Sequence, residues 1–242
     1  MRSVRIYQPG AYGVGEIVEL SPSASQHVGV VLRMQPNDSL VLFCGDNREF
    51  SATIDRVDKK KVVVRITDVQ EKNCESPRLI HLAQAISKGD RMEWVIQKAV
   101  ELGVASITPL FTTRCVVKLD ANRLEKKHQQ WQAIAIAACE QSGRNQVPEL
   151  YPAITLDNFL NRCSAPIRFV LNPHGAISWR DYHSSTGDIA LLIGPEGGLS
   201  DDEITQAQSQ GFQSMVLGPR VLRTETAAIA ALSVLQAVCG DL

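Results

Sequence analysis

The apolar positions follow two different rhythms along the chain. Up to about residue 72 they occur in short runs at 39–44, 49–57 and 61–69, and turn residues at 45–47 and 58–60 separate these runs. Such runs between turns are typical of strands. A short helix over 23–34 interrupts them, and Val28, Val31 and Leu32 share one face of it. This part therefore predicts a β-rich module, either a meander or a small barrel.

From residue 78 onward, strand and helix patterns alternate. Strands are predicted at 79–86, 107–111, 167–171, 189–193 and 215–217, and a long helix at 123–142. A helix over 91–102 begins with Asp90 and Glu93 in capping-box spacing and ends at Gly103. Its apolar stripe consists of Met92, Val95, Ile96, Ala99 and Val100. This alternation predicts an α/β domain with a mainly parallel sheet covered on both faces.

The polar segment 70–77 separates the two rhythms and ends in a proline. It is the best candidate for a linker. The sequence therefore predicts two domains, at 1–72 and 73–242.

Composition excludes several classes of protein. The 242 residues are 44% hydrophobic and 21% charged, with a net charge of −1, which is typical of a globular protein and not of a disordered one. The longest nearly apolar run, 227–239, is shorter than the ~18 residues that a membrane-spanning helix needs. No secretory signal is visible at the start of the chain. The six cysteines form no C-x-x-C pair, so we expect reduced, mostly buried thiols in a cytoplasmic protein without a membrane segment.

Two glycine-rich loops carry the candidate chemistry. The first, at 193–200, and the second, at 217–226, each follow a predicted strand and precede a helix. Ser200 and Glu203 have the spacing of a capping box for a helix over 201–210. Ligands of open α/β sheets bind beyond the carboxyl ends of strands, so the two loops predict one shared pocket. The alternative is that the glycines only make tight turns. Neither loop has the spacing of a dinucleotide site or a P-loop.

The two loops also resemble a known signature. The string GPEGGL at 194–199 and the string LGPRVLRTETA at 217–227 are similar to the signature pair of the SPOUT superfamily of RNA methyltransferases. More narrowly, they resemble the bacterial family that methylates N3 of a uridine in 16S ribosomal RNA. Stretches at 5–7, 27–34, 96–104 and 138–144 match the same family, so the resemblance covers nearly the whole chain.

This resemblance implies a fold and an activity. It implies a PUA-like RNA-binding β-barrel at 1–72 and a SPOUT methyltransferase domain with a trefoil knot at 73–242. It implies S-adenosyl-L-methionine as methyl donor, 16S rRNA or the small ribosomal subunit as substrate, and a homodimer. In the final helix, ten of the twelve residues at 227–238 are apolar, which fits a dimer interface or a core within one chain equally well.

The resemblance also implies roles for individual residues. Arg223 first, and Arg220 second, would stabilise the charge that develops on the uracil carbonyl oxygens, and Glu196 could be the general base. Each arginine could instead form an ion pair with Glu225 or Glu196. The residues expected to hold the cofactor are Leu171, Gly194, Pro195, Glu196, Gly197, Gly198, Leu199, Leu217, Gly218, Val221, Leu222 and Thr226.

Phosphate contacts with RNA need cationic side chains, and both predicted domains supply candidates. These candidates are Arg5, Arg33, Lys88, Arg91, Lys98 and Arg144. The five histidines are scattered without metal-ligand spacing, so no metal is expected.

Two other functions stay open at this point. The chain could be a non-catalytic RNA-binding dimer, in which case it would have no affinity for S-adenosylmethionine. It could also be an α/β enzyme that acts on a phosphorylated small molecule at the 194–198 loop, in which case it would ignore RNA.

Overall fold

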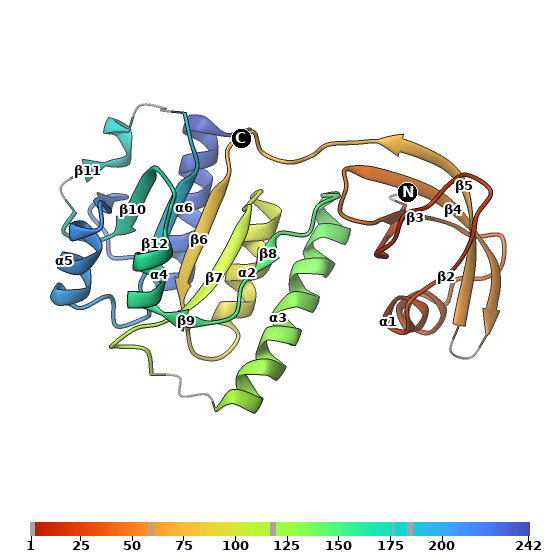
Figure 1. Cartoon of the computed structure of the whole chain (residues 1–242), viewed down its shortest axis with the longest axis horizontal. Coiled ribbons are helices and arrows are strands. Elements are labelled where there is room, and N and C mark those ends of the chain that lie inside the picture. The colour runs from red at the N-terminus through yellow and green to blue at the C-terminus, as the bar shows by residue number, and fades with distance from the viewer. Residues whose placement is uncertain (1–2, 59–60, 117–119, 176, 183–185) are drawn as a thin grey trace. The chain divides into compact units, whose positions relative to one another are not determined.

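The computed structural model describes residues 3–58, 61–116, 120–175, 177–182 and 186–242 (Figure 1). The chain divides into two compact units. The first contains residues up to 75 together with 139–147, and the second contains 76–138 and 148–242. The segment 139–147 is therefore separated in sequence from the rest of its unit. The domain limits expected from the sequence, 1–72 and 73–242, stay a prediction.

The first unit is built on a five-stranded sheet with strand order β1-β3-β4-β5-β2. Its strands are β1 (Val4–Tyr7), β2 (Ile17–Glu19), β3 (Ser39–Phe43), β4 (Arg48–Asp58) and β5 (Lys61–Glu71). β1 pairs with β3 in parallel, whereas the other neighbours are antiparallel. The predicted meander of three strands is confirmed, and part of the turn between β4 and β5, residues 59–60, lies outside the described residues. Closure into a barrel stays a prediction.

The short helix of this unit differs from the sequence pattern. It consists of α1 (Pro22–Gln26) followed by a π-helical turn, η1 (His27–Val31). Of the three apolar residues predicted to share one face, only Val28 is buried, while Val31 is 62% and Leu32 39% exposed. In a π-helical turn the hydrogen bonds run from i to i+5, which changes the angle between successive side chains, so Val28 and Val31 no longer share one face. The three residues therefore do not form one buried stripe.

Buried polar contacts hold the segment 139–147 against other residues of the first unit. The guanidinium of Arg5 pairs with Glu49 and donates to Asn145 Oδ1 at 2.6 Å, while Arg144 pairs with Glu75. Only 7% of the Arg5 side chain and 5% of the Arg144 side chain are exposed. The geometry therefore does not support the expected phosphate contacts by Arg5 and Arg144, because both guanidiniums are buried against carboxylates.

The second unit is built on an eight-stranded sheet with the order β11-β13-β10-β12-β6-β7-β8, and β9 pairs with β7. The strands are β6 (Ile80–Ala85), β7 (Ser106–Phe111), β8 (Glu149–Leu150), β9 (Ile154–Thr155), β10 (Ile167–Leu171), β11 (Ile177–Ser178), β12 (Ile189–Ile193) and β13 (Gln213–Val216). Every pairing among these described strands is parallel, as the sequence predicts.

Helices cover both faces of this sheet (Figure 1). They are α2 (Arg91–Glu101), α3 (Ala121–Ser142), α4 (Leu156–Arg162), α5 (Asp201–Ser209) and α6 (Thr224–Cys239), together with the 3-10 turn η2 (Trp179–Asp181). Residues of α4 and α5 share one core cluster with Ala190 and Leu192 of β12. On the other face α6 packs against α2 and β12. Because neighbouring residues of a strand point to opposite faces, β12 is buried on both sides.

Local signals in this unit agree with the structure in part. The predicted stripe of α2 is buried at all five positions, and Ser200 with Glu203 forms the predicted capping box at the start of α5. Asp90, in contrast, makes no side-chain cap. Its expected partner Glu93 instead accepts hydrogen bonds from Lys127 and Gln130, at 2.9 and 2.8 Å. These two partners come from α3 and could not be read from the local spacing.

The cysteines are less buried than expected. None of the six forms a disulfide; Cys139 is buried, Cys74 is exposed, and the other four are partly buried. The expectation of mostly buried thiols was therefore wrong. Of the helices in the described part of the chain, none combines the length and apolar character needed to cross a membrane.

Candidate active site

A cleft of about 610 Å³ lies where β10, β12 and β13 end. Three segments that follow these strands line it, at 171–174, 193–199 and 215–222. The prediction that the two glycine-rich loops form one pocket is therefore confirmed. The turn at 171–174 is a third wall, and Leu171 in it is among the residues expected to hold a cofactor.

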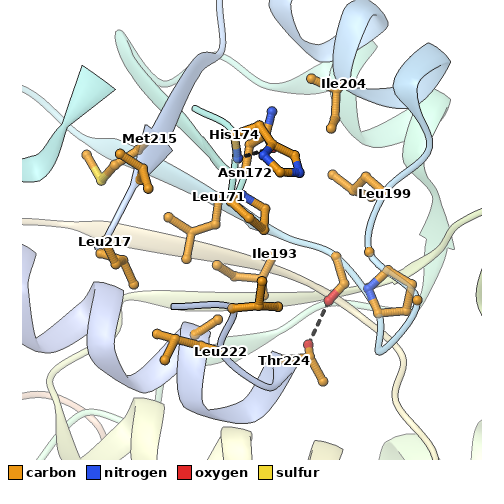
Figure 2. A pocket seen from close by; sticks show the side chains of 18 of the residues that line it. Leu171, Asn172, His174, Ile193, Leu199, Ile204, Met215, Leu217, Leu222 and Thr224 are labelled. Carbon is orange, nitrogen blue, oxygen red and sulfur yellow. Dashed lines mark hydrogen bonds between the residues drawn. The ribbon is translucent and has the colours of Figure 1, made fainter. Parts of the chain in front are cut away.

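The wall of the cleft combines apolar side chains with polar and charged ones in about equal share. Figure 2 shows the apolar side chains around one space, with Asn172 and His174 at one end and Thr224 at the other. The apolar lining includes Leu171, Ile193, Leu199, Ile204, Met215, Leu217 and Leu222. Charged and polar residues in the lining include Arg114, Asn172, His174, Glu196, Asp201 and Arg220. Such a cleft suits a ligand with a flat apolar part and a charged part.

Most of the residues expected to hold a cofactor come together in this cleft. They are Leu171, Gly194, Pro195, Glu196, Gly197, Gly198, Leu199, Leu217, Gly218, Val221 and Leu222. Thr226 and the expected catalytic residue Arg223 line a neighbouring cavity, whereas Arg220 lines the cleft. Whether these residues bind a cofactor stays a prediction.

Sequence reasoning missed Arg114. It follows β7, and its Nη1 donates hydrogen bonds to the carbonyl oxygens of Gly197 and Leu199, at 3.0 and 3.2 Å. The Arg114 side chain thereby holds the first glycine-rich loop in place. The available signal was its position just after a predicted strand, which is where ligand-binding residues of parallel sheets lie.

A buried hydrogen-bond relay connects the two loops. Gln84 Nε2 donates to Thr224 Oγ1 at 3.0 Å, and Thr224 Oγ1 donates to the Gly194 carbonyl oxygen at 2.6 Å. Gln84 is completely buried and Thr224 is 5% exposed. The relay therefore joins the end of β6, the first turn of α6 and the first glycine-rich loop.

The first loop needs glycine at two positions. A Cβ on Gly194 would lie 2.9 Å from the Leu199 amide nitrogen, closer than real Cβ contacts allow. Gly198 has φ +70° and closes a turn in which its amide donates to the Pro195 carbonyl at 2.9 Å. These glycines therefore do shape a tight turn, and the same turn forms the wall of the cleft.

A second, more open cavity of about 760 Å³ lies beside this cleft. The residues around it are Lys88, Gly89, Asp90, Arg91, Trp94, Arg223, Glu225 and Thr226. Thr224 lines the cleft, while its neighbours Arg223 and Glu225 line the second cavity. The start of α6 is therefore a wall shared by the two cavities.

Arg91 holds the two carboxylates of this region. Its Nη1 lies 2.7 Å from Glu196 Oε1 and its Nε lies 3.7 Å from Glu225 Oε1. Within the described residues neither Arg220 nor Arg223 forms an ion pair. The alternative prediction, that these arginines pair with Glu225 or Glu196, is therefore wrong, because Arg91 pairs with both carboxylates. Their charges are free to face a ligand.

The same contacts set the protonation of Glu196. Burial alone would raise the pKa of its carboxyl group, but hydrogen bonds from its own amide, from the Lys88 amide at 2.9 Å and from Arg91 outweigh burial. The net pKa is therefore lower than its ordinary value. A carboxylate with a lowered pKa accepts a proton less readily, which disfavours Glu196 as a general base.

The candidate phosphate contacts divide into two groups. Arg5, Arg91, Lys98 and Arg144 form ion pairs, with Lys98 Nζ lying 2.8 Å from Glu101 Oε1. Lys88 and Arg33 are exposed and form no ion pair that involves the described residues. A search of the described residues finds no cluster of three or more side chains that could hold a metal ion.

Comparisons with known proteins place both units in context. The family model described as "RNA methyltransferase domain" matches residues 74–236, and the model described as "RNA methyltransferase PUA domain" matches residues 20–67. A protein of Buchnera aphidicola named ribosomal RNA small subunit methyltransferase E is 38% identical over 100% of this chain and 98% of its own. The Bacillus subtilis protein of the same name is 34% identical over 86% of this chain and 84% of its own.

Solved structures are also similar over the full length. A putative methyltransferase from Legionella pneumophila, in complex with S-adenosylmethionine, has a TM-score of 0.98 and 59% identity over 100% of both chains. A ribosomal RNA small subunit methyltransferase E from Neisseria gonorrhoeae, bound to S-adenosylmethionine, has a TM-score of 0.93 and 38% identity over 100% of both chains.

The relay predicts a specific stability effect. We expect Thr224→Val to lower the free energy of unfolding by about 1–3 kcal/mol, because it removes the hydroxyl from two buried hydrogen bonds while keeping the volume. Thr224→Ser keeps the hydroxyl and should cost clearly less. Urea unfolding curves measure both variants. A valine variant as stable as the wild-type protein would show that the relay contributes nothing to the stability of this region.

Proposed function

Because this chain belongs to the bacterial ribosomal RNA small subunit methyltransferase E family, we propose that it methylates RNA of the small ribosomal subunit with S-adenosylmethionine as donor. The observation that carries the proposal is the cleft at the ends of β10, β12 and β13. It lies in a chain that matches, along its whole length, two structures with S-adenosylmethionine bound.

The residues of the cleft fit this donor. The apolar wall formed by Leu171, Ile193 and Leu222 suits an adenine ring, and backbone groups of the two loops can hydrogen-bond its edge. Arg114 and Arg220 offer positive charge to a carboxylate, and Asp201 offers negative charge to an ammonium group. When bound, S-adenosylmethionine supplies an electrophilic methyl group.

We propose N3 of a uridine as the acceptor, as the family resemblance implies. This nitrogen must lose its proton, and the negative charge then spreads onto the two neighbouring carbonyl oxygens. An unpaired guanidinium beside the cleft stabilises this charge, so we assign Arg223 to the role and keep Arg220 as the second choice. Glu196 is better described as a positioning residue, because it orients Arg91 and the Lys88 amide.

The two alternative functions have less support. A non-catalytic RNA-binding dimer does not account for a cleft that matches structures with the methyl donor bound. An enzyme for phosphorylated small molecules would need phosphate-binding spacing in the first loop, which the sequence lacks.

One pair of measurements tests the proposed function. We expect isothermal titration to show binding of S-adenosylmethionine, and we expect tritiated methyl transfer to small ribosomal subunits from a strain that lacks this enzyme. Base-resolved mapping should then find a single N3-methylated uridine. Binding without transfer to any RNA substrate would contradict the proposal, and so would transfer in the absence of donor binding.

Arg223→Ala should affect transfer and not donor binding. We expect its turnover to fall about 100- to 1000-fold, the usual cost of removing one donor that stabilises transition-state charge. The affinity for S-adenosylmethionine should change by less than about twofold, since Arg223 lies outside the cleft. Single-turnover assays and isothermal titration measure the two effects. Arg223→Lys, the matched control, should recover part of the rate, and unchanged turnover in the alanine variant would refute the assignment.

We also propose a cytoplasmic homodimer that contacts RNA through Arg33 and Lys88. Support for the dimer comes from α6, on which Ile229, Ala230 and Val234 stay only partly buried within one chain. Partly exposed apolar residues on one helix are typical of an interface between subunits. The trefoil knot, which the family resemblance implies, also stays a proposal.

The dimer proposal has a direct test. We expect the wild-type protein to sediment as a dimer, and we expect Ala230→Glu to shift it towards monomer, because a carboxylate in an apolar interface loses its hydration. Ser209→Glu on α5 adds the same charge at an exposed position and should leave the dimer intact. A wild-type monomer at micromolar concentration would exclude the homodimer.

A further inference from the structure

The second cavity contains an aromatic side chain that the fold does not use. Trp94 lies in the first turn of α2 and is 44% exposed. Its neighbours Met92, Val95 and Ile96 supply the buried stripe of the helix, each 1% exposed or less. Trp94 is therefore on the opposite side of the helix from the core, and its large apolar surface faces the cavity.

The charged groups around Trp94 complement a nucleotide. Lys88 and Arg223 provide donors without a competing ion pair among the described residues. Glu225 provides a hydrogen-bond acceptor, since its Oε2 has no partner among the described residues although it is buried. A uracil presents two carbonyl acceptors, one N–H donor and a flat face, so an aromatic surface between donors and an acceptor matches each of these features.

The position of the cavity matters as much as its lining. The start of α6 separates it from the cleft, with Thr224 on one side and Arg223 and Glu225 on the other. Glu196 lines the cleft and is bonded to Arg91 of the second cavity at 2.7 Å. A base held against Trp94 would therefore lie on the other side of the first turn of α6 from a donor in the cleft.

We propose that this second cavity is the acceptor-base subsite, in which Trp94 stacks on an unstacked pyrimidine of RNA while Arg223, Lys88 and Glu225 contact its polar edge. The inference rests on the proposed function and extends it by naming the residue that holds the base. Stacking on an aromatic side chain is tolerant of base identity, so the polar edge contacts provide the selectivity for a pyrimidine.

Three variants test the subsite. Trp94→Ala removes the stacking surface and should raise KM for RNA about 10- to 100-fold, the range of one base–aromatic stack. Trp94→Phe keeps a ring and should stay within about fivefold of wild type. Tyr151→Ala is the matched control, because Tyr151 is also an exposed aromatic residue of the same unit, at 40%, and lines neither cavity. All three should bind S-adenosylmethionine as wild type does.

A second measurement separates base stacking from a merely structural role. RNA with an abasic site at the target should bind wild type about tenfold or more weakly than intact RNA, and this difference should disappear in Trp94→Ala. An equal difference in both proteins would overturn the inference. The inference would also be overturned if Trp94→Ala were a monomer and the wild-type protein a dimer, because Trp94 would then contact the second subunit. If wild-type protein transfers no methyl group to any RNA, the proposed function itself fails.

Discussion

The structure of the site depends on one constraint, which is that two loops far apart in the sequence must stay at a fixed spacing. Gln84, Thr224 and Gly194 meet this constraint with two buried hydrogen bonds of 3.0 and 2.6 Å. A buried polar chain of this kind is stable only when its donors and acceptors match, so small shifts of either loop cost free energy. The cleft between the loops is therefore preorganised, and little ordering free energy remains to be spent when a ligand binds.

A second feature of the site is the way its charges are divided. Arg91 forms ion pairs with both Glu196 and Glu225. Arg220 and Arg223 have no ion pair among the described residues. A guanidinium that is already neutralised by a carboxylate would stabilise developing negative charge poorly. In the proposed mechanism, the pairing of Arg91 with both carboxylates leaves the guanidiniums of Arg220 and Arg223 available to a ligand.

The sequence predicts those parts of the fold that depend on local chemistry. The stripe of α2 and the Ser200–Glu203 capping box are correct because residues three or four positions apart decide them. β1 and β2 are too short to show a period, and the π-helical turn changes the period itself. In the site, the strand-end rule places the glycine-rich loops correctly and, applied further, would have found Arg114. The partners of Arg5, Arg91 and Arg144 come from distant segments, so their ion pairs have no local signal.

These ion pairs also bear on how a protein with a net charge of −1 can select RNA. Four of the six cations expected to contact phosphate are neutralised within the chain, so phosphate contacts alone provide little affinity. The remaining positive charge of the second unit includes Lys88 and Arg223, which lie beside Trp94. We therefore expect base stacking and shape at that cavity to add to the phosphate contacts proposed for Arg33 and Lys88, and these forces act only on a base that has left its stack. Such a division of the contacts favours an irregular, already exposed nucleotide over the uniform backbone of a duplex.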